Sequence, residues 1–197
     1  HAAPGALRFL TPAFALALFL NGALLFTVQL MVARRLLPRF GGAPAVWVTC
    51  AFVFQTLLVL GYAYARLLGS RARPAVQYAV HLLLLAAACL FIPIAFPASE
   101  PSADSGNPTL SVIRLLLGAV GVPFFLLSAA SPLLQQWFAQ TAHSAARDPY
   151  FLYSASNLGS LLGLLGYPLG IEPHMGLASQ GTAWGTGFLV AVALTAL

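Results

Sequence analysis

Long uncharged stretches, separated by short polar segments, dominate the chain. No Asp, Glu, Lys or Arg interrupts residues 9–33, 40–65, 74–99, 115–146, 149–171 and 173–197. Each stretch reaches the length of about 20 residues that a helix needs to cross about 30 Å of hydrocarbon. The apolar runs are continuous, whereas the strands of a membrane β-barrel alternate apolar and polar residues. The pattern therefore predicts six membrane spans at 11–33, 45–66, 75–96, 109–138, 149–170 and 180–197.

We therefore expect an all-α integral membrane protein, a single domain over residues 1–197 that forms a bundle of six transmembrane helices. Composition agrees, because only 7% of the residues are charged, against about 25% in soluble domains. The lipid bilayer is thus the first expected partner. The chain begins with His1 and ends within an apolar run, which is compatible with a partial chain that lacks a following soluble domain.

The distribution of arginine indicates an orientation. All nine basic residues are Arg, and in this topology Arg8, Arg66, Arg71, Arg73 and Arg147 face one side while Arg34, Arg35, Arg39 and Arg114 face the other. The positive-inside rule and the compact basic loop 66–73 favour cytoplasmic termini. The Ala- and Gly-rich composition, without Lys, is typical of a bacterial protein, so we expect the bacterial inner (cytoplasmic) membrane. A net charge of +5 shared among membrane loops does not indicate a nucleic-acid partner.

Three of the predicted spans carry polar side chains within the membrane. The first and second spans carry one glutamine each, and the fifth carries several polar residues on one helix face. Gln29 and Gln55 lie at similar depth on either side of the Gly41-Gly42 turn, where they could clamp two helices together or contact a substrate. In the fifth span, helical spacing puts four polar residues on one face. The expected intramembrane polar stripe is therefore Gln29, Gln55, Tyr150, Tyr153, Asn157 and Ser160.

The fifth span also carries four glycines in small-xxx-small spacing. This spacing lets a neighbouring helix backbone approach closely. The expected packing residues are Gly159, Gly163, Gly166 and Gly170. In the fourth span, which is too long to cross straight, Pro123 and Pro132 are expected to introduce kinks.

Charged residues at the span ends are candidates for contact with a partner or an anion. Arg34 and Arg35 are adjacent on a helix and therefore point about 100° apart, and Arg114 lies one turn into its span, where it could also snorkel to headgroups. Glu172 falls on the same side of the membrane as the first arginine cluster, which allows an ion pair. This candidate set is Arg34, Arg35, Arg39, Arg114 and Glu172.

Motifs for catalysis, cofactors and metals are missing from the sequence. The chain has no nucleophile elbow, phosphate loop, zinc-protease motif or dinucleotide fingerprint. Its histidines lack the spacing of metal ligands, and Cys50 and Cys89 lie in different spans. We therefore expect a non-catalytic protein without a metal site or cofactor.

Four short strings resemble one bacterial family when they are taken together. They are Leu-Pro-Arg-Phe-Gly-Gly at 37–42, Pro-Ala-Val-Trp at 44–47, Asp-Pro-Tyr-Phe-Leu-Tyr at 148–153 and Ser-Asn-Leu-Gly-Ser at 156–160. They resemble the N-terminal membrane region of spermidine-synthase-like membrane proteins of the fused major-facilitator type. The resemblance implies a bundle similar to half of a major-facilitator fold, followed in relatives by an aminopropyltransferase-like domain. No donor-binding loop of that domain occurs in this chain.

Two functions remain open at this point. The preferred one is an accessory or anchoring subunit of a membrane complex, or the membrane anchor of a spermidine-synthase-like protein, with other membrane subunits or a second copy as partners. The alternative is a half-facilitator transporter of a small polar or anionic solute that acts as a homodimer. A transporter requires a polar cavity near the middle of the membrane and broken or repeated helices, whereas an anchor requires only complementary outer faces.

Overall fold

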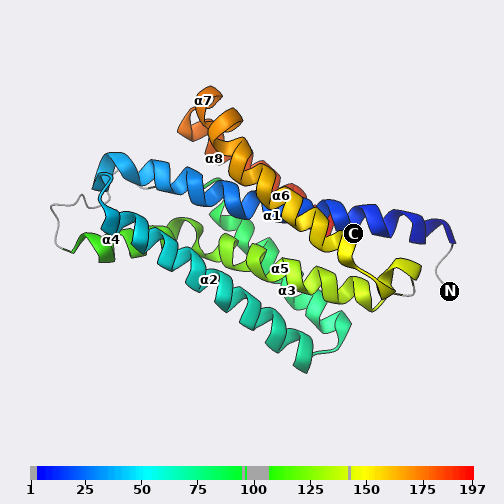
Figure 1. Ribbon diagram of the computed structural model, residues 1–197. Coiled ribbons are helices and arrows are strands. Elements are labelled where there is room, and N and C mark those ends of the chain that lie inside the picture. The colour runs from blue at the N-terminus through cyan, green and yellow to red at the C-terminus, as the bar shows by residue number, and fades with distance from the viewer. Residues whose placement is uncertain (1–3, 95, 97–106, 142) are drawn as a thin grey trace.

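The chain is all-helical throughout the part that the structure describes. This computed structural model describes residues 4–94, 96, 107–141 and 143–197. Within these ranges there is no strand, and six helical passes run along one elongated bundle (Figure 1). The predicted all-α class is therefore confirmed.

The first three passes are single helices joined by short turns. They are α1 (Pro4–Phe40), α2 (Pro44–Arg71) and α3 (Pro74–Ala88), the last extended by the 3-10 turn η1 (Cys89–Phe91). Gly41 ends α1 with a positive φ of 71°, the left-handed conformation in which glycine pays no steric penalty. Its amide donates to the Leu37 carbonyl at 2.9 Å, so the predicted glycine turn closes the first hairpin.

The remaining passes are more irregular. The fourth is built from α4 (Pro108–Leu116), the π segment η2 (Leu117–Gly121) and α5 (Val122–Ala139). After the 3-10 turn η3 (Ser144–Arg147), the fifth pass consists of α6 (Tyr150–Gly166), the π segment η4 (Tyr167–Ile171) and α7 (Glu172–His174). The sixth is α8 (Leu177–Thr195).

Five helices are long and apolar enough to cross a membrane, which makes the chain a multi-pass membrane protein. They cover Thr11–Phe40, Pro44–Arg71, Pro74–Phe91, Pro108–Ala139 and Leu177–Thr195. The predicted fifth span at 149–170 is the exception, because regular helix there stops after the 17 residues of α6. At a rise of 1.5 Å per residue, 17 residues cover only about 26 Å. Five of the six predicted spans are therefore long enough to cross a membrane as regular helices, and the predicted fifth span is not.

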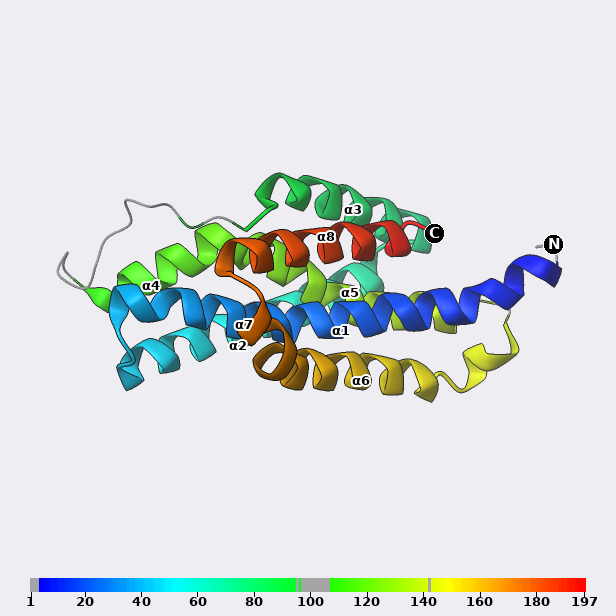
Figure 2. The same cartoon turned by 90° about the horizontal axis from the view of Figure 1, so that it is seen from above.

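The arrangement nevertheless takes the chain along the bundle six times. α8 runs antiparallel to α1, since Trp184 bonds the Leu24 carbonyl while Arg35 bonds the Leu177 carbonyl. Both chain ends consequently lie toward the same end of the bundle (Figure 2). α6 runs parallel to α1, because Gly159 meets Phe19 and Gly163 meets Ala23. α6 thus runs beside α1 in the same direction, although it is shorter than the five candidate membrane spans.

Proline explains both π segments. Pro123 follows η2 and Pro168 lies within η4. A proline inside a helix has no amide hydrogen and its ring crowds the carbonyl four residues earlier, which a widened π turn relieves. Pro123 thus follows a π segment in the fourth pass, whereas Pro132 lies inside the continuous helix α5. The predicted kinks at both prolines stay predictions.

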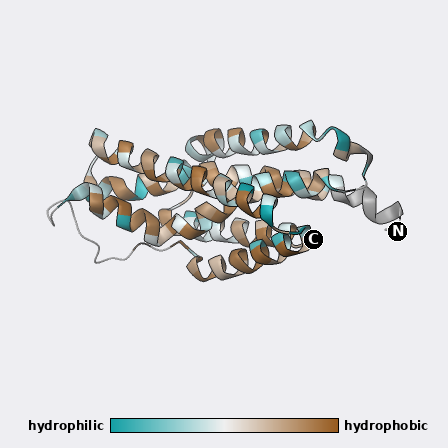
Figure 3. Cartoon of the chain, turned by 90° about the horizontal axis from the view of Figure 1, so that it is seen from below, coloured by the Kyte–Doolittle hydropathy of each residue, from teal (hydrophilic) through white to brown (hydrophobic). Residues whose placement is uncertain are grey.

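α1 is the centre of the bundle. It packs most extensively against α6, then against α8 and α5, while α2 packs mainly against α5. The principal core cluster joins Val28, Met31 and Val32 of α1 to Phe124 of α5 and Phe188 of α8. Large hydrophobic side chains are exposed on the outer helices, among them Leu83 at 71% and Phe52 at 64%, as expected where lipid replaces water. Hydrophobic residues, brown in Figure 3, recur along the helices.

Candidate functional site

A polar cavity of about 430 Å³ lies between α1, α2, α5 and α6. It is near the middle of the membrane layer, because the lining residue Gly22 lies close to the centre of the uncharged stretch 9–33. None of the described lining residues is charged. Its polar side chains come from all four helices: Gln29, Gln55, Tyr62, Ser131, Gln135, Tyr153, Ser156, Asn157 and Ser160.

The cavity gathers most of the polar stripe that the sequence indicates. Five of its six residues line the wall: Gln29, Gln55, Tyr153, Asn157 and Ser160. Tyr150 is not among them; it lies at the start of α6 and is 74% exposed. Asn157 and Gln55 are also exposed on the protein surface. The open side of the cavity therefore presents uncharged amides at the depth of the hydrocarbon.

The predicted Gln29–Gln55 clamp is absent from the described residues. Gln29 Nε2 instead donates to the Leu25 carbonyl of its own helix at 3.0 Å. Because a carbonyl can only accept, this bond fixes the amide orientation and leaves Gln29 Oε1 as an acceptor. Gln29 and Gln55 thus share a cavity wall without bonding each other.

Two of the four predicted glycines lie at the contact between α1 and α6. A Cβ on Gly159 would overlap the Phe19 carbonyl oxygen, and one on Gly163 would lie 2.5 Å from that of Ala23. Gly166 and Gly170 have no described atom within 4 Å of an added Cβ, so they make no such contact within the described chain and their packing role stays a prediction. On the other helix, a Cβ on Gly22 would lie 2.5 Å from the Ser156 carbonyl.

Asn21 is the residue of this region that the predictions missed. It is 2% exposed, and its Nδ2 donates at 2.8 Å to both the Leu127 carbonyl and Ser131 Oγ of α5. The Leu127 bond fixes the amide, and Asn21 Oδ1 is buried without a hydrogen-bond partner among the described residues. The signal was the same as for Gln29, an amide within an uncharged stretch, but its partner is 110 positions away in sequence.

The candidate charged residues divide into three environments. Arg34 Nη1 pairs with Glu172 Oε1 at 2.9 Å and also donates to the Glu172 carbonyl at 3.1 Å. Arg35 and Arg39 point into a second cavity, between α1 and α8. Arg114 is exposed on α4 and lines neither cavity. The arginine cluster is therefore shared between an ion pair and a separate cavity, and it does not form one site.

The described ranges hold His, Cys, Asp and Glu side chains that could each bind a metal ion. No group of three or more His, Cys, Asp or Glu side chains gathers there. His81 is fully buried, beside the rings of Tyr64 and Trp137. His143 bonds Thr11 and the Ala145 amide, and His174 contacts the Gly170 carbonyl. The three described histidines thus lie in separate structural environments.

Comparison with known proteins adds no relative. No family model, curated protein or solved structure matches this chain. The resemblance to spermidine-synthase-like membrane proteins thus stays a prediction that rests on the four quoted strings.

Proposed function

We propose that the chain is half of a transporter, and that it binds a small uncharged polar solute in the cavity between α1, α2, α5 and α6. The observation that carries the proposal is the convergence of nine polar side chains from four helices on a cavity without a described charge. An anchor has no need of such a convergence near the middle of the membrane. The accessory or anchoring role is therefore the competing function that the experiment must exclude.

The open side of the cavity indicates a partner that completes it. Amides such as Gln55 and Asn157 are exposed there, and an amide that meets hydrocarbon without a hydrogen-bond partner is costly. A second copy of the chain would cover this face and enclose the cavity. We therefore propose a homodimer in which each copy supplies one half of the solute site.

Helix irregularity supports movement around this cavity. The π segments η2 and η4 interrupt the fourth and fifth passes, and π-bulges are frequent at functional sites. Interrupted helices around a central site are typical of secondary transporters. α6 of the fifth pass also packs in parallel against α1, and Gly159 and Gly163 bring the two backbones into close contact.

Hydrogen-bond chemistry narrows the solute to a neutral molecule rich in donors. Gln29 Oε1 in the cavity wall is an acceptor whose orientation is fixed by the bond that Nε2 of the same amide donates. Asn21 contributes only indirectly, because its Oδ1 is buried and its amide holds Ser131 of the wall. A polyol or sugar would supply hydroxyl donors, whereas an anion would find no described positive charge in the wall. We therefore favour the polar over the anionic solute.

The cellular setting is part of the proposal. The arginine distribution supports cytoplasmic termini in a bacterial inner membrane. The resemblance to spermidine-synthase-like proteins would add a soluble domain outside this chain. Neither feature is required for solute binding in the cavity.

Uptake into proteoliposomes tests the proposal directly. The purified chain is reconstituted, and accumulation of radiolabelled sorbitol, inositol and glucose is measured, with succinate as the anionic control. We expect uptake of at least one neutral solute, and a decrease of about tenfold in Asn157→Leu, which corresponds to loss of about 1.4 kcal/mol of binding. The matched control is Ser154→Ala, on the same helix but outside the cavity lining.

The outcome separates the two functions. If the chain transports a neutral solute and Asn157→Leu leaves the uptake rate unchanged, the solute does not pass through this cavity. Absence of uptake for every solute, together with a stable membrane subunit that co-purifies with the chain, would support the anchoring role instead.

A further inference from the structure

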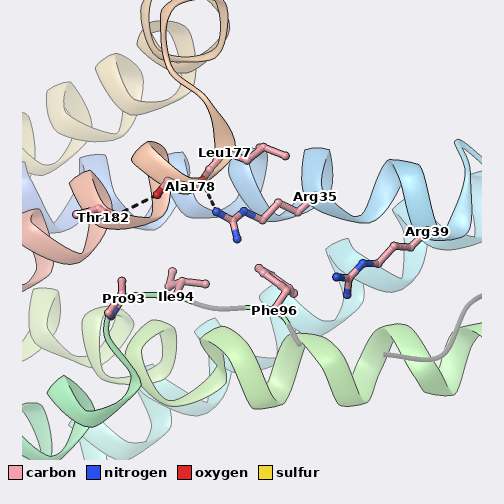
Figure 4. Close-up of a pocket in the computed structure, with 8 residues that line it drawn as sticks. All are labelled: Arg35, Arg39, Pro93, Ile94, Phe96, Leu177, Ala178 and Thr182. Carbon is pink, nitrogen blue, oxygen red and sulfur yellow. Dashed lines mark hydrogen bonds between the residues drawn. The ribbon is translucent and has the colours of Figure 1, made fainter. Parts of the chain in front are cut away.

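A second cavity, of about 480 Å³, lies between the end of α1 and the start of α8. It is lined by two arginines and by residues of α8 and of the segment that follows α3: Arg35, Arg39, Pro93, Ile94, Phe96, Leu177, Ala178 and Thr182. Figure 4 shows both arginine side chains extending from α1 into the space between α8 and this segment. The cavity thus combines guanidinium groups with apolar walls.

Arg35 is held in place with part of its donor capacity unused. Its Nη2 donates to the Leu177 carbonyl, and its guanidinium carbon lies 5.4 Å from the centre of the Phe96 ring. A guanidinium carries five N–H donors in a planar fork that fits phosphate and carboxylate oxygens. The fixed side chain therefore offers a preorganised anion contact.

The start of α8 adds to the positive character of the cavity. α8 begins at Leu177 after Gly176, and no side chain caps its free amides. The first turn of a helix carries partial positive charge and unpaired N–H groups, which favour an anion. Leu177 and Ala178 of this turn line the same cavity as Arg35. The described lining contains no acidic residue, and Glu172 is already paired with Arg34.

The depth of the cavity identifies where such an anion comes from. The uncharged stretch of α1 ends at residue 33, so Arg35 and Arg39 lie in the last turns of the helix, at the level of the headgroups. The walls formed by Pro93, Ile94 and Leu177 are apolar. A phosphate joined to acyl chains matches both features, because its oxygens suit the guanidinium and its acyl chains suit the apolar walls.

We infer that this arginine cavity binds the phosphate group of an anionic phospholipid, with the guanidinium of Arg35 as its contact. The acyl chains would lie against the apolar wall and the neighbouring helix surfaces. The inference is independent of the proposed solute cavity, because no residue lines both.

Native mass spectrometry of the full chain, purified in a neutral detergent, tests the inference. Equimolar phosphatidylglycerol and phosphatidylcholine are added, and retained lipid is counted. We expect preferential retention of phosphatidylglycerol, reduced about fivefold in Arg35→Gln, the effect of one arginine near a membrane surface. Arg114→Gln, an exposed arginine outside the cavity, is the matched control and should retain the wild-type preference.

A variant that keeps both arginines guards against misfolding of Arg35→Gln. Ala178→Trp is designed to fill the cavity from the exposed first turn of α8, and it should lower phosphatidylglycerol retention to the level of phosphatidylcholine. Equal retention of the two lipids by the wild type, or an unchanged preference in Ala178→Trp, would overturn the inference. Displacement of the lipid by an equal concentration of inorganic phosphate would assign the cavity to the free anion and overturn the lipid assignment.

Discussion

The two cavities described above differ in depth and in chemistry. The one between α1, α2, α5 and α6 lies near the middle of the membrane layer and is lined by uncharged amides and hydroxyls. The one between α1 and α8 lies at the end of α1 and is lined by Arg35 and Arg39. Two cavities of similar size in the same small bundle thus differ in the polar groups that line them: one has uncharged side chains and the other has arginines.

The cost of charge at each depth accounts for the difference. A charged side chain at the centre of a bilayer costs about 2.5–3.5 kcal/mol on insertion scales, whereas an arginine at the headgroup level gains about 1 kcal/mol from anionic lipid. Amides can be tolerated near the midplane where they bond a neighbouring helix, as Asn21 bonds α5. The sequence shows the same separation, because Arg35 and Arg39 follow the uncharged stretch 9–33 instead of interrupting it.

An arginine placed in each cavity in turn tests the difference in depth most strongly. We expect Asn157→Arg to lower the free energy of unfolding by about 3 kcal/mol, because it puts a charge near the midplane. Ala178→Arg, at the headgroup level, should cost less than about 1 kcal/mol. Equilibrium unfolding in mixed micelles measures both. Equal costs would show that depth does not separate the cavities.

A smaller effect should follow from widening the α1–α6 contact. A Cβ on Gly159 would overlap the Phe19 carbonyl, so Gly159→Ala must push the two helices apart and should cost about 1–3 kcal/mol of unfolding free energy. Gly166→Ala is the control, because no described atom lies within 4 Å of its added Cβ. The folded fraction of Gly159→Ala should retain anionic lipid as the wild type does. If both variants were equally stable, the glycine contact would not hold the wall of the solute cavity.

Periodicity along single helices was enough to predict a large part of this picture. Uncharged stretches located the membrane-crossing passes, and the spacing of Tyr153, Asn157 and Ser160 put them on one face that lines the solute cavity. Gly41 was predicted to form the turn after α1. These features depend on local spacing and on the chemistry of individual residues, which a sequence carries directly.

Features that depend on contacts between distant segments were missed or wrong. The bonds of Asn21 reach α5, and the packing of Gly159 but not Gly166 depends on where α1 crosses α6. The 17-residue length of α6 reflects the π segment around Pro168, which interrupts a stretch that is uncharged throughout in sequence. Likewise, the arginine cavity needs Phe96 and Leu177, which are far from Arg35 along the chain.

The most direct test of the central claim is the water accessibility of the solute cavity. A single cysteine is placed at Ser156, a lining residue, in a chain whose native Cys50 and Cys89 are replaced by serine. The control position is Leu158, which is 51% exposed on the same helix but outside the cavity lining. Reaction with a charged, membrane-impermeant methanethiosulfonate is then measured in proteoliposomes. We predict that Ser156→Cys is labelled and Leu158→Cys is not; an unreactive Ser156→Cys, or equal labelling of both, would contradict a water-accessible cavity.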